Sequence, residues 1–164
     1  MAGIAIYVLK QGFEQLSAAL VTQTPSPAAP APGEEEATAQ ALRLQAYERF
    51  TLMLERIAVP SLLLRQPPPE DISARAYTAN LLLTIRDEVE YNVTQQIYVS
   101  DSLWNIIQQA RDNVSQLIVR AAEGAEGGAQ VANRLRLMSG QQPADAIQLA
   151  QAAIRREASG LLAG

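Results

Sequence analysis

The spacing of apolar residues restricts the fold of this chain more than any other feature. Between residues 36 and 160 they recur every three or four positions. This spacing matches the period of about 3.6 residues of an α-helix and places the apolar side chains on one face. The alternation that predicts a half-buried strand is absent, and the β-like pair Tyr98-Val99 is too short to form one. The pattern therefore predicts an all-α fold.

Five helices follow from this pattern and from the residues that begin and end helices. Three long helices are expected at about residues 36–59, 70–96 and 101–123, the second beginning between residues 70 and 73, and two shorter ones at about 129–138 and 143–160. Pro60 is expected to end the first, Ser100 or Asp101 to cap the third, and Gly124 to form a left-handed C-terminal cap. Pro143 suits the first turn of the last helix, and Gly160 is expected to close it. We expect an antiparallel bundle of three main helices, with two shorter C-terminal helices packed over it.

The apolar stripes of these helices give a predicted core. The first stripe is Leu42, Ala46, Phe50, Met53 and Ile57, widened by Tyr47 and Leu54. The second is Ile72, Ala76, Ala79, Leu82, Ile85, Val89, Val93 and Ile97. The third is Leu103, Ile107, Ala110, Val114, Leu117 and Ala121. Each stripe is expected to face the centre of the bundle.

Three regions of different composition divide the chain. Residues 1–21 are apolar near their start, residues 22–35 are rich in proline and alanine, and residues 36–160 hold the helical pattern. The proline-rich stretch favours an extended linker. A membrane span needs about 20 apolar residues, and Ile4–Leu9 is much shorter. We interpret it as the last turns of a membrane helix that begins before Met1, or else as a terminal helix docked on the body.

The residue types that the chain lacks exclude several kinds of chemistry. It has no cysteine and no histidine, so disulfides, thiolate metal sites and histidine-based catalysis are ruled out. We therefore expect no bound metal and no cofactor. The net charge is −4, and no segment is strongly basic, whereas a nucleic-acid binder usually carries a basic face. Nucleic acid is therefore not expected as a partner.

The densest acidic cluster is Arg86-Asp87-Glu88-Val89-Glu90. Arg86 and Glu90 stand four residues apart, which predicts an ion pair on the surface of a helix. Two nearby carboxylates can also perform acid–base chemistry. A small enzyme using carboxylate or arginine chemistry is therefore one alternative function.

Three aromatic residues gather where the second and third helices meet. Tyr91, Tyr98 and Trp104 lie within a short stretch of an aromatic-poor chain. Exposed tyrosine and tryptophan anchor many protein interfaces, so these residues are a candidate partner-binding patch. The alternative is a packed corner of the bundle.

Polar side chains beside the apolar stripe form a second candidate group. Asn92 and Gln96 would need hydrogen-bond partners if they were buried, and Arg43 and Glu48 could supply them from the neighbouring helix. Such a network would help to specify how the helices pair. The alternative is that these residues form a solvated edge.

Two segments, Leu42–Ile57 and Leu83–Trp104, resemble a bacterial family of unknown function. The resemblance covers residues 40–120 well and the last helix loosely. It implies an N-terminal membrane helix, a variable linker and a helical cytoplasmic body, with no activity to carry over. The chain departs from the family in holding only the stub Ile4–Leu9 in place of a full membrane helix.

Taken together, these observations predict a non-enzymatic helical module that binds a protein partner or itself. The expected location is the cytoplasm, at the inner face of the membrane if the N-terminal segment is an anchor. A peripheral protein of lipid surfaces is the other alternative.

Overall fold

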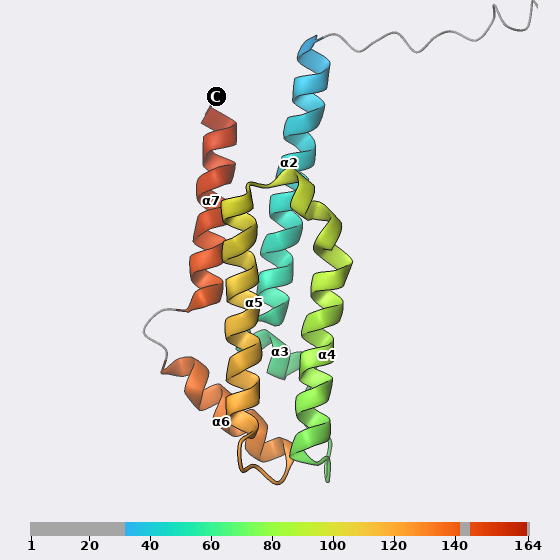
Figure 1. Cartoon of the computed structure of the whole chain (residues 1–164), viewed down its shortest axis with the longest axis vertical. Coiled ribbons are helices and arrows are strands. Elements are labelled where there is room, and N and C mark those ends of the chain that lie inside the picture. The colour runs from blue at the N-terminus through green and yellow to red at the C-terminus, as the bar shows by residue number, and fades with distance from the viewer. Residues whose placement is uncertain (1–31, 142–144, 164) are drawn as a thin grey trace, which may run out of the picture. The chain divides into compact units, whose positions relative to one another are not determined.

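Helices dominate the computed structural model of the chain, which describes residues 32–141 and 145–163 (Figure 1). The helices in these ranges are α2 (Pro32–Ile57), α3 (Val59–Arg65), α4 (Ala74–Asn92), the 3-10 helix η1 (Val93–Tyr98), α5 (Asp101–Ala122), α6 (Gly128–Gly140) and α7 (Ala146–Ala163). Within the same ranges, β-type pairing is limited to one isolated bridge between Ser73 and Gly127. The predicted all-α class is confirmed.

Two units make up the chain, Met1–Ala37 and Thr38–Gly164. The predicted N-terminal segment, and the linker as far as residue 31, lie outside the described residues. Helix α2 begins at Pro32, four residues before the predicted start. Proline fits the first turn of a helix. The negative charges of Glu34 and Glu35 in that turn stabilise the helix, because its N-terminal end carries a partial positive charge. The last residues of the predicted linker are therefore helical.

The prediction that Pro60 ends the first helix is wrong, because a further helix contains it. α2 stops at Ile57, and α3 begins at Val59 with Pro60 in its first turn. A proline there needs no backbone N–H partner. Leu62 and Leu63 of α3 are buried, so this short helix belongs to the core.

The predicted apolar face of the second helix is partly wrong. Ala76, Ala79, Val93 and Ile97 are exposed. The buried face of α4 consists of Ala74, Tyr77, Leu81, Ile85, Val89 and Asn92. This face includes the large side chains of Tyr77 and Leu81, which bury more area than the two alanines would. The α-helix also ends at Asn92 and continues as η1, whereas a single helix to residue 96 was predicted.

The remaining helices agree more closely with the sequence. All six predicted core residues of α5 are buried. The side chain of Ser100 caps this helix by accepting a hydrogen bond from the N–H of Leu103. Gly124 has the predicted left-handed backbone, with a φ of 63°. The prediction that Gly160 closes the last helix is wrong, because α7 continues to Ala163. Pro143 lies outside the described residues. The last helix was expected to be shorter than the three main helices. With 18 residues, α7 is nearly as long as α4, which has 19.

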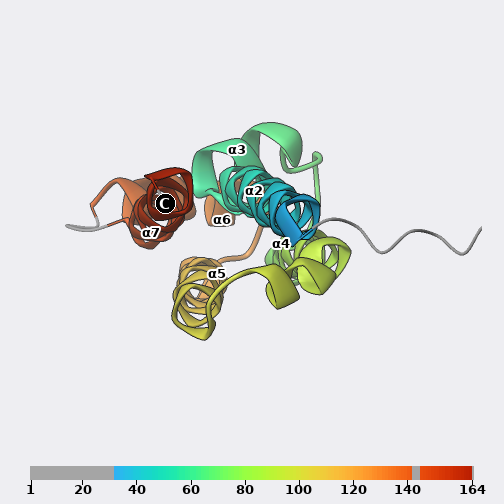
Figure 2. The same cartoon turned by 90° about the horizontal axis from the view of Figure 1, so that it is seen from above.

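Four helices of the Thr38–Gly164 unit lie side by side. Figure 1 shows α2, α4, α5 and α7 running alongside one another in alternating directions, and Figure 2 shows them end on. Closely approaching backbones join α5 to α4, α6 and α7. Side-chain hydrogen bonds tie α2 to α4 through Arg49 and Asn92, and to α7 through Tyr47 and Glu157. The core lies between these helices and includes Phe50 and Leu135.

At one end of the bundle, the chain before α4 packs on the start of α6. The N–H of Gly128 donates to the carbonyl of Ile72 at 2.8 Å, and the N–H of Ala74 donates to the carbonyl of Glu126 at 2.9 Å. A Cβ atom on Gly128 would collide with the side chain of Ile72 and lie 3.1 Å from Tyr77. Gly128 therefore permits the close approach of α6 to α4.

Candidate functional site

A groove of about 700 Å³ opens between α2, α3 and α4. We call it the arginine groove and define it by the residues that determine its chemistry, Arg49, Leu52, Arg56, Arg65, Glu88 and Tyr91. Three arginines and two acids line it, Asp87 being the second acid, so its formal charge is +1. The chain as a whole carries −4. The groove is therefore a locally cationic hollow on an acidic protein.

One carboxylate holds two of the three arginines. Oε1 of Glu88 accepts from Arg56 at 2.6 Å and from Arg65 at 3.4 Å. The hydrogen bond to Glu88 raises the pKa of Arg56 above its usual value, and the negative charge of Glu88 raises it further. Arg65 also donates to the backbone carbonyl of Arg56 at 2.5 Å. These bonds connect α2, α3 and α4 and give the floor of the groove a fixed shape.

The third arginine is held by the last residue of α4. Nε of Arg49 donates to Oδ1 of Asn92 at 3.3 Å, and its guanidinium lies 5.1 Å from the ring centre of Tyr91. A second, longer bond of 3.5 Å reaches the carbonyl of Tyr91. Asn92 is only 5% exposed, and its amide donates to the carbonyl of Glu88 at 2.8 Å. Arg49 is therefore positioned by a buried amide on one side and an aromatic ring on the other.

Two large apolar side chains flank the cationic groups. Leu52 is 60% exposed and Tyr91 is 75% exposed, and both line the groove. Tyrosine and arginine are enriched among the residues that anchor protein interfaces, and exposed leucine beside them adds apolar surface to bury. The groove can therefore offer apolar contact and charge-assisted hydrogen bonds to one ligand.

The predicted polar network is only partly assembled here. Asn92 lies at the groove, but its partner is Arg49 in place of the expected Arg43 or Glu48, which are both exposed. Gln96 is exposed on η1, where its carbonyl accepts from the N–H of Val99. The hydrogen bond joins residues 43 apart on two packed helices, and the apolar pattern does not show which residues of the two helices face each other.

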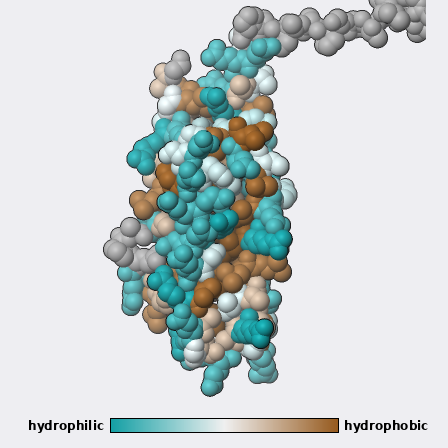
Figure 3. All heavy atoms as spheres, viewed as in Figure 1, coloured by the Kyte–Doolittle hydropathy of each residue, from teal (hydrophilic) through white to brown (hydrophobic). Residues whose placement is uncertain are grey.

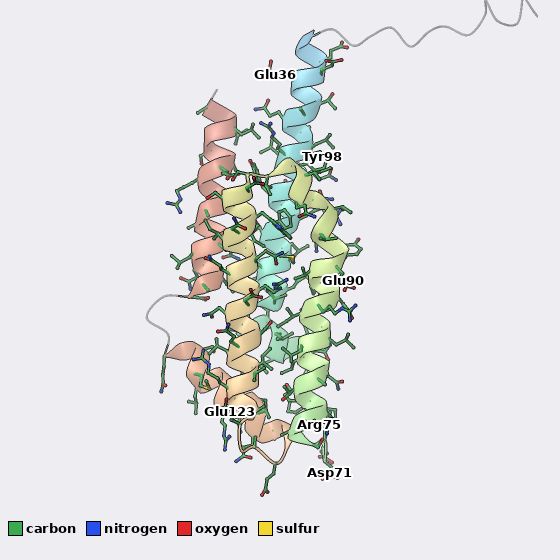
Figure 4. The ribbon with its side chains drawn as sticks, viewed as in Figure 1. Glu36, Asp71, Arg75, Glu90, Tyr98 and Glu123 are labelled. Carbon is green, nitrogen blue, oxygen red and sulfur yellow. The ribbon has the colours of Figure 1, made fainter. Side chains whose placement is uncertain are left out.

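The three predicted aromatic residues do not share one surface. Tyr91 lines the arginine groove, whereas Tyr98 lines a separate hollow of about 290 Å³ with Arg43, Tyr47 and Glu157. Figure 4 shows Tyr98 at the end of the η1 turn, before α5 begins. Trp104 packs against Phe50, with ring centres 5.6 Å apart and planes tilted by 41°. Trp104 is therefore part of the packing around the core.

Beside Tyr98, one carboxylate joins three parts of the fold. Glu157 of α7 accepts hydrogen bonds from the hydroxyl of Tyr47 at 3.3 Å and from the hydroxyl of Ser100. Burial raises the pKa of Tyr47, and the charge of Glu157 and this hydrogen bond raise it further. Glu157 was not among the predicted site residues, because no local motif links residues so far apart.

The predicted pair in the acidic cluster is confirmed. Arg86 and Glu90 are bonded at 2.6 Å, and both side chains are exposed. Figure 4 shows Glu90 on α4. Arg86 and Glu90 border one of two hollows between α4 and α5, which share Leu82 and Ser115. Apolar surface appears between α4 and α5 on the face drawn in Figure 3. These hollows, of about 440 and 350 Å³, are smaller than the arginine groove.

The residues that form the arginine groove were largely missed from the sequence. Arg49, Leu52 and Arg56 stand at positions i, i+3 and i+7 of α2, so they share one face of the helix. This spacing is the signal that could have identified them. Glu88 was noted as part of the acidic cluster, without its partners on α2 and α3.

Within residues 32–141 and 145–163, no group of three or more acidic side chains is arranged to hold a metal ion. None of the helices in that part of the chain has the length and apolarity needed to cross a bilayer.

Comparison with known proteins gives one match. Residues 2–161 match a family described as a family of unknown function, DUF7935. No curated protein and no solved structure matches the chain.

Proposed function

The chain belongs to the DUF7935 family, and from that premise we propose that its helical body is a non-enzymatic docking module which binds a protein partner in the arginine groove. The observation that carries this proposal is the exposure of Leu52 and Tyr91 along a groove with three arginines. Burying these two side chains would remove apolar surface from water, worth about 1.5–3 kcal/mol for an aliphatic residue such as leucine. The arginines would add directional contacts at the same place.

The rigidity of the groove supports docking. Its walls are helices whose inner faces belong to the core, and Glu88 and Asn92 fix the arginines from within. A groove that already has its bound shape loses little conformational entropy when a ligand binds. Exposed apolar residues on loops would have to be ordered first.

The test uses photo-crosslinking from matched positions in the full chain. A photoreactive residue replaces Leu52 in one variant and Leu149 in another, within cells of the native host. Leu149 of α7 is 57% exposed and lines none of the described hollows, so it matches Leu52 in type and exposure. A protein crosslinked from Leu52 alone is then purified and titrated against Leu52→Glu and Leu149→Glu.

We expect Leu52→Glu to weaken binding about tenfold or more, and Leu149→Glu to leave it nearly unchanged. Equal crosslinking from both positions, or equal affinity of both glutamate variants, would contradict the proposal. Self-association is the other outcome that this experiment can reveal. If the crosslinked protein is a second copy of this chain, the partner is the chain itself and a separate partner is ruled out at this groove.

We also propose that residues 1–21 hold this body at the inner face of a bacterial membrane. The support is the apolar run that includes Ile4, Ile6, Val8 and Leu9. Flotation with liposomes tests the idea by comparing the full chain with a variant carrying Ile6→Glu and Val8→Glu. The charged variant should lose liposome binding while its thermal midpoint stays the same. Equal flotation of both proteins would contradict membrane attachment through this segment.

A further inference from the structure

Arg49 differs from the other two arginines of the groove in how much of its hydrogen-bonding capacity is used. Arg56 and Arg65 both donate to the Glu88 carboxylate. In the described part of the chain, Arg49 makes only two hydrogen bonds, at 3.3 and 3.5 Å, and neither acceptor is charged. A guanidinium has five N–H donors, so most of its capacity is available to a ligand.

The contacts of Arg49 hold the guanidinium in place without neutralising it. The Asn92 amide accepts from Nε, and Tyr91 contacts the guanidinium through its ring and its carbonyl. Holding Nε in this way favours presentation of the terminal nitrogens to a planar acceptor. An arginine fixed in this way binds a carboxylate through two parallel hydrogen bonds and loses little side-chain entropy in doing so.

The charges near Arg49 favour an acidic ligand. Glu88 is already bonded to two arginines, and Asp87 is exposed at the groove on α4. The lining therefore keeps a formal charge of +1, on a chain of net charge −4. Leu52 stands one turn from both Arg49 and Arg56 on α2, so apolar and cationic contacts alternate along the same helix face.

We propose that the partner enters the arginine groove as an amphipathic helix, with an aspartate or glutamate bound by Arg49 and its apolar face over Leu52 and Tyr91. Helices dock in grooves between helices through apolar residues at positions i, i+3, i+4 and i+7. The acidic residue would stand beside that stripe. Asn92 acts as a positioning residue that orients Arg49 and does not touch the ligand. This inference rests on the proposed function and adds the chemistry of the partner.

The experiment uses a displayed library of helical peptides of about 18 residues, which is about five turns. Leucine is fixed at the apolar positions, and the flanking positions are randomised. The full chain is the bait, and peptides that also bind Leu52→Glu are removed. The recovered peptides are then titrated against the wild-type chain, Arg49→Gln, Arg49→Lys and Asn92→Ala. Arg75→Gln is the matched control, because Arg75 is an exposed arginine outside the described hollows.

We expect the recovered peptides to be enriched in aspartate or glutamate at one flanking position. Replacing that acid with its amide should weaken binding to the wild-type chain about tenfold, the effect of one charge-assisted contact. The same replacement should have almost no effect on binding to Arg49→Gln. With Asn92→Ala, the preference for the acid should shrink while the amide peptide keeps its affinity. Arg49→Lys should keep part of the preference, and Arg75→Gln all of it.

Two failures are distinguishable. If no peptide remains once those that also bind Leu52→Glu are removed, the proposed docking function itself is wrong. If peptides depend on Leu52 but show no acidic enrichment, or keep their preference for the acid in Arg49→Gln, the groove binds a partner and the inferred role of Arg49 is wrong. Circular dichroism and thermal unfolding of each variant separate lost binding from lost folding.

Discussion

Nε of Arg49 on α2 donates to the side-chain oxygen of Asn92, where α4 gives way to the 3-10 helix η1. The distance is 3.3 Å, and Asn92 is the one polar residue among the buried side chains of the described ranges. A buried amide is costly unless its donors and acceptors are bonded. This contact therefore links the end of a helix, the pairing of α2 with α4 and the cationic surface of the groove.

Replacing Asn92 with alanine should reduce the free energy of unfolding by about 1–3 kcal/mol. The variant loses the bond from Arg49 and the bond to the Glu88 carbonyl, each worth about 0.5–1.5 kcal/mol. Urea denaturation measures the change. Gln96→Ala is the control, because that exposed side chain should contribute less than about 0.5 kcal/mol. Equal loss in both variants would show that the buried amide has no special role.

Replacing glycine with alanine should have opposite effects on the free energy of unfolding at positions 128 and 160. Gly128→Ala should destabilise the protein by about 1–3 kcal/mol, because the new Cβ would collide with Ile72 and crowd Tyr77. Gly160 lies inside α7 with open space around it, so Gly160→Ala should stabilise by about 0.5–1 kcal/mol. Thermal unfolding of the two variants beside the wild type checks both signs. A stable Gly128→Ala variant would argue against close packing of α6 on α4.

The contribution of Tyr47 to stability should disappear at high pH. Burial, with help from Glu157, raises the pKa of Tyr47 above its ordinary value of 10.0. Because the tyrosine ionises more readily in the unfolded chain, its contribution is complete below pH 10 and is lost as the pH rises through the folded-state pKa. The wild type should therefore be more stable than Tyr47→Phe at about pH 9, and this advantage should shrink by about pH 11. Urea midpoints at both values test it, and a constant difference would contradict it.

Truncating Phe50 should destabilise the core and change the fluorescence of the single tryptophan. Phe50 is fully buried and lies 5.6 Å from Trp104 between ring centres. Phe50→Ala should reduce the free energy of unfolding by about 3–5 kcal/mol. The emission of Trp104 should shift to longer wavelength in the folded variant, since its neighbour is removed. Leu149→Ala, at an exposed site, should leave both quantities nearly unchanged.

Much of the fold follows from the sequence because helices depend on local patterns. The period of the apolar residues predicted the all-α class, and it identified six of the seven buried residues of α5, missing only Ile118. Ser100 and Gly124 were predicted as caps because hydroxyl side chains and a left-handed glycine each satisfy one end of a helix locally. The ion pair of Arg86 and Glu90 was predictable for the same reason, since both lie on one helix.

Tertiary structure decided which of several apolar faces is buried and which polar groups meet. The α4 sequence offers apolar residues on more than one side, and packing against α5 and α6 selected the face with Tyr77 and Leu81. Arg49 and Asn92 are 43 residues apart, and Tyr47 and Glu157 are 110 apart. No local spacing relates such pairs. The periodicity of the sequence therefore determined the helices, whereas the groove and its chemistry depend on how those helices pack, because packing alone brings distant side chains within bonding distance.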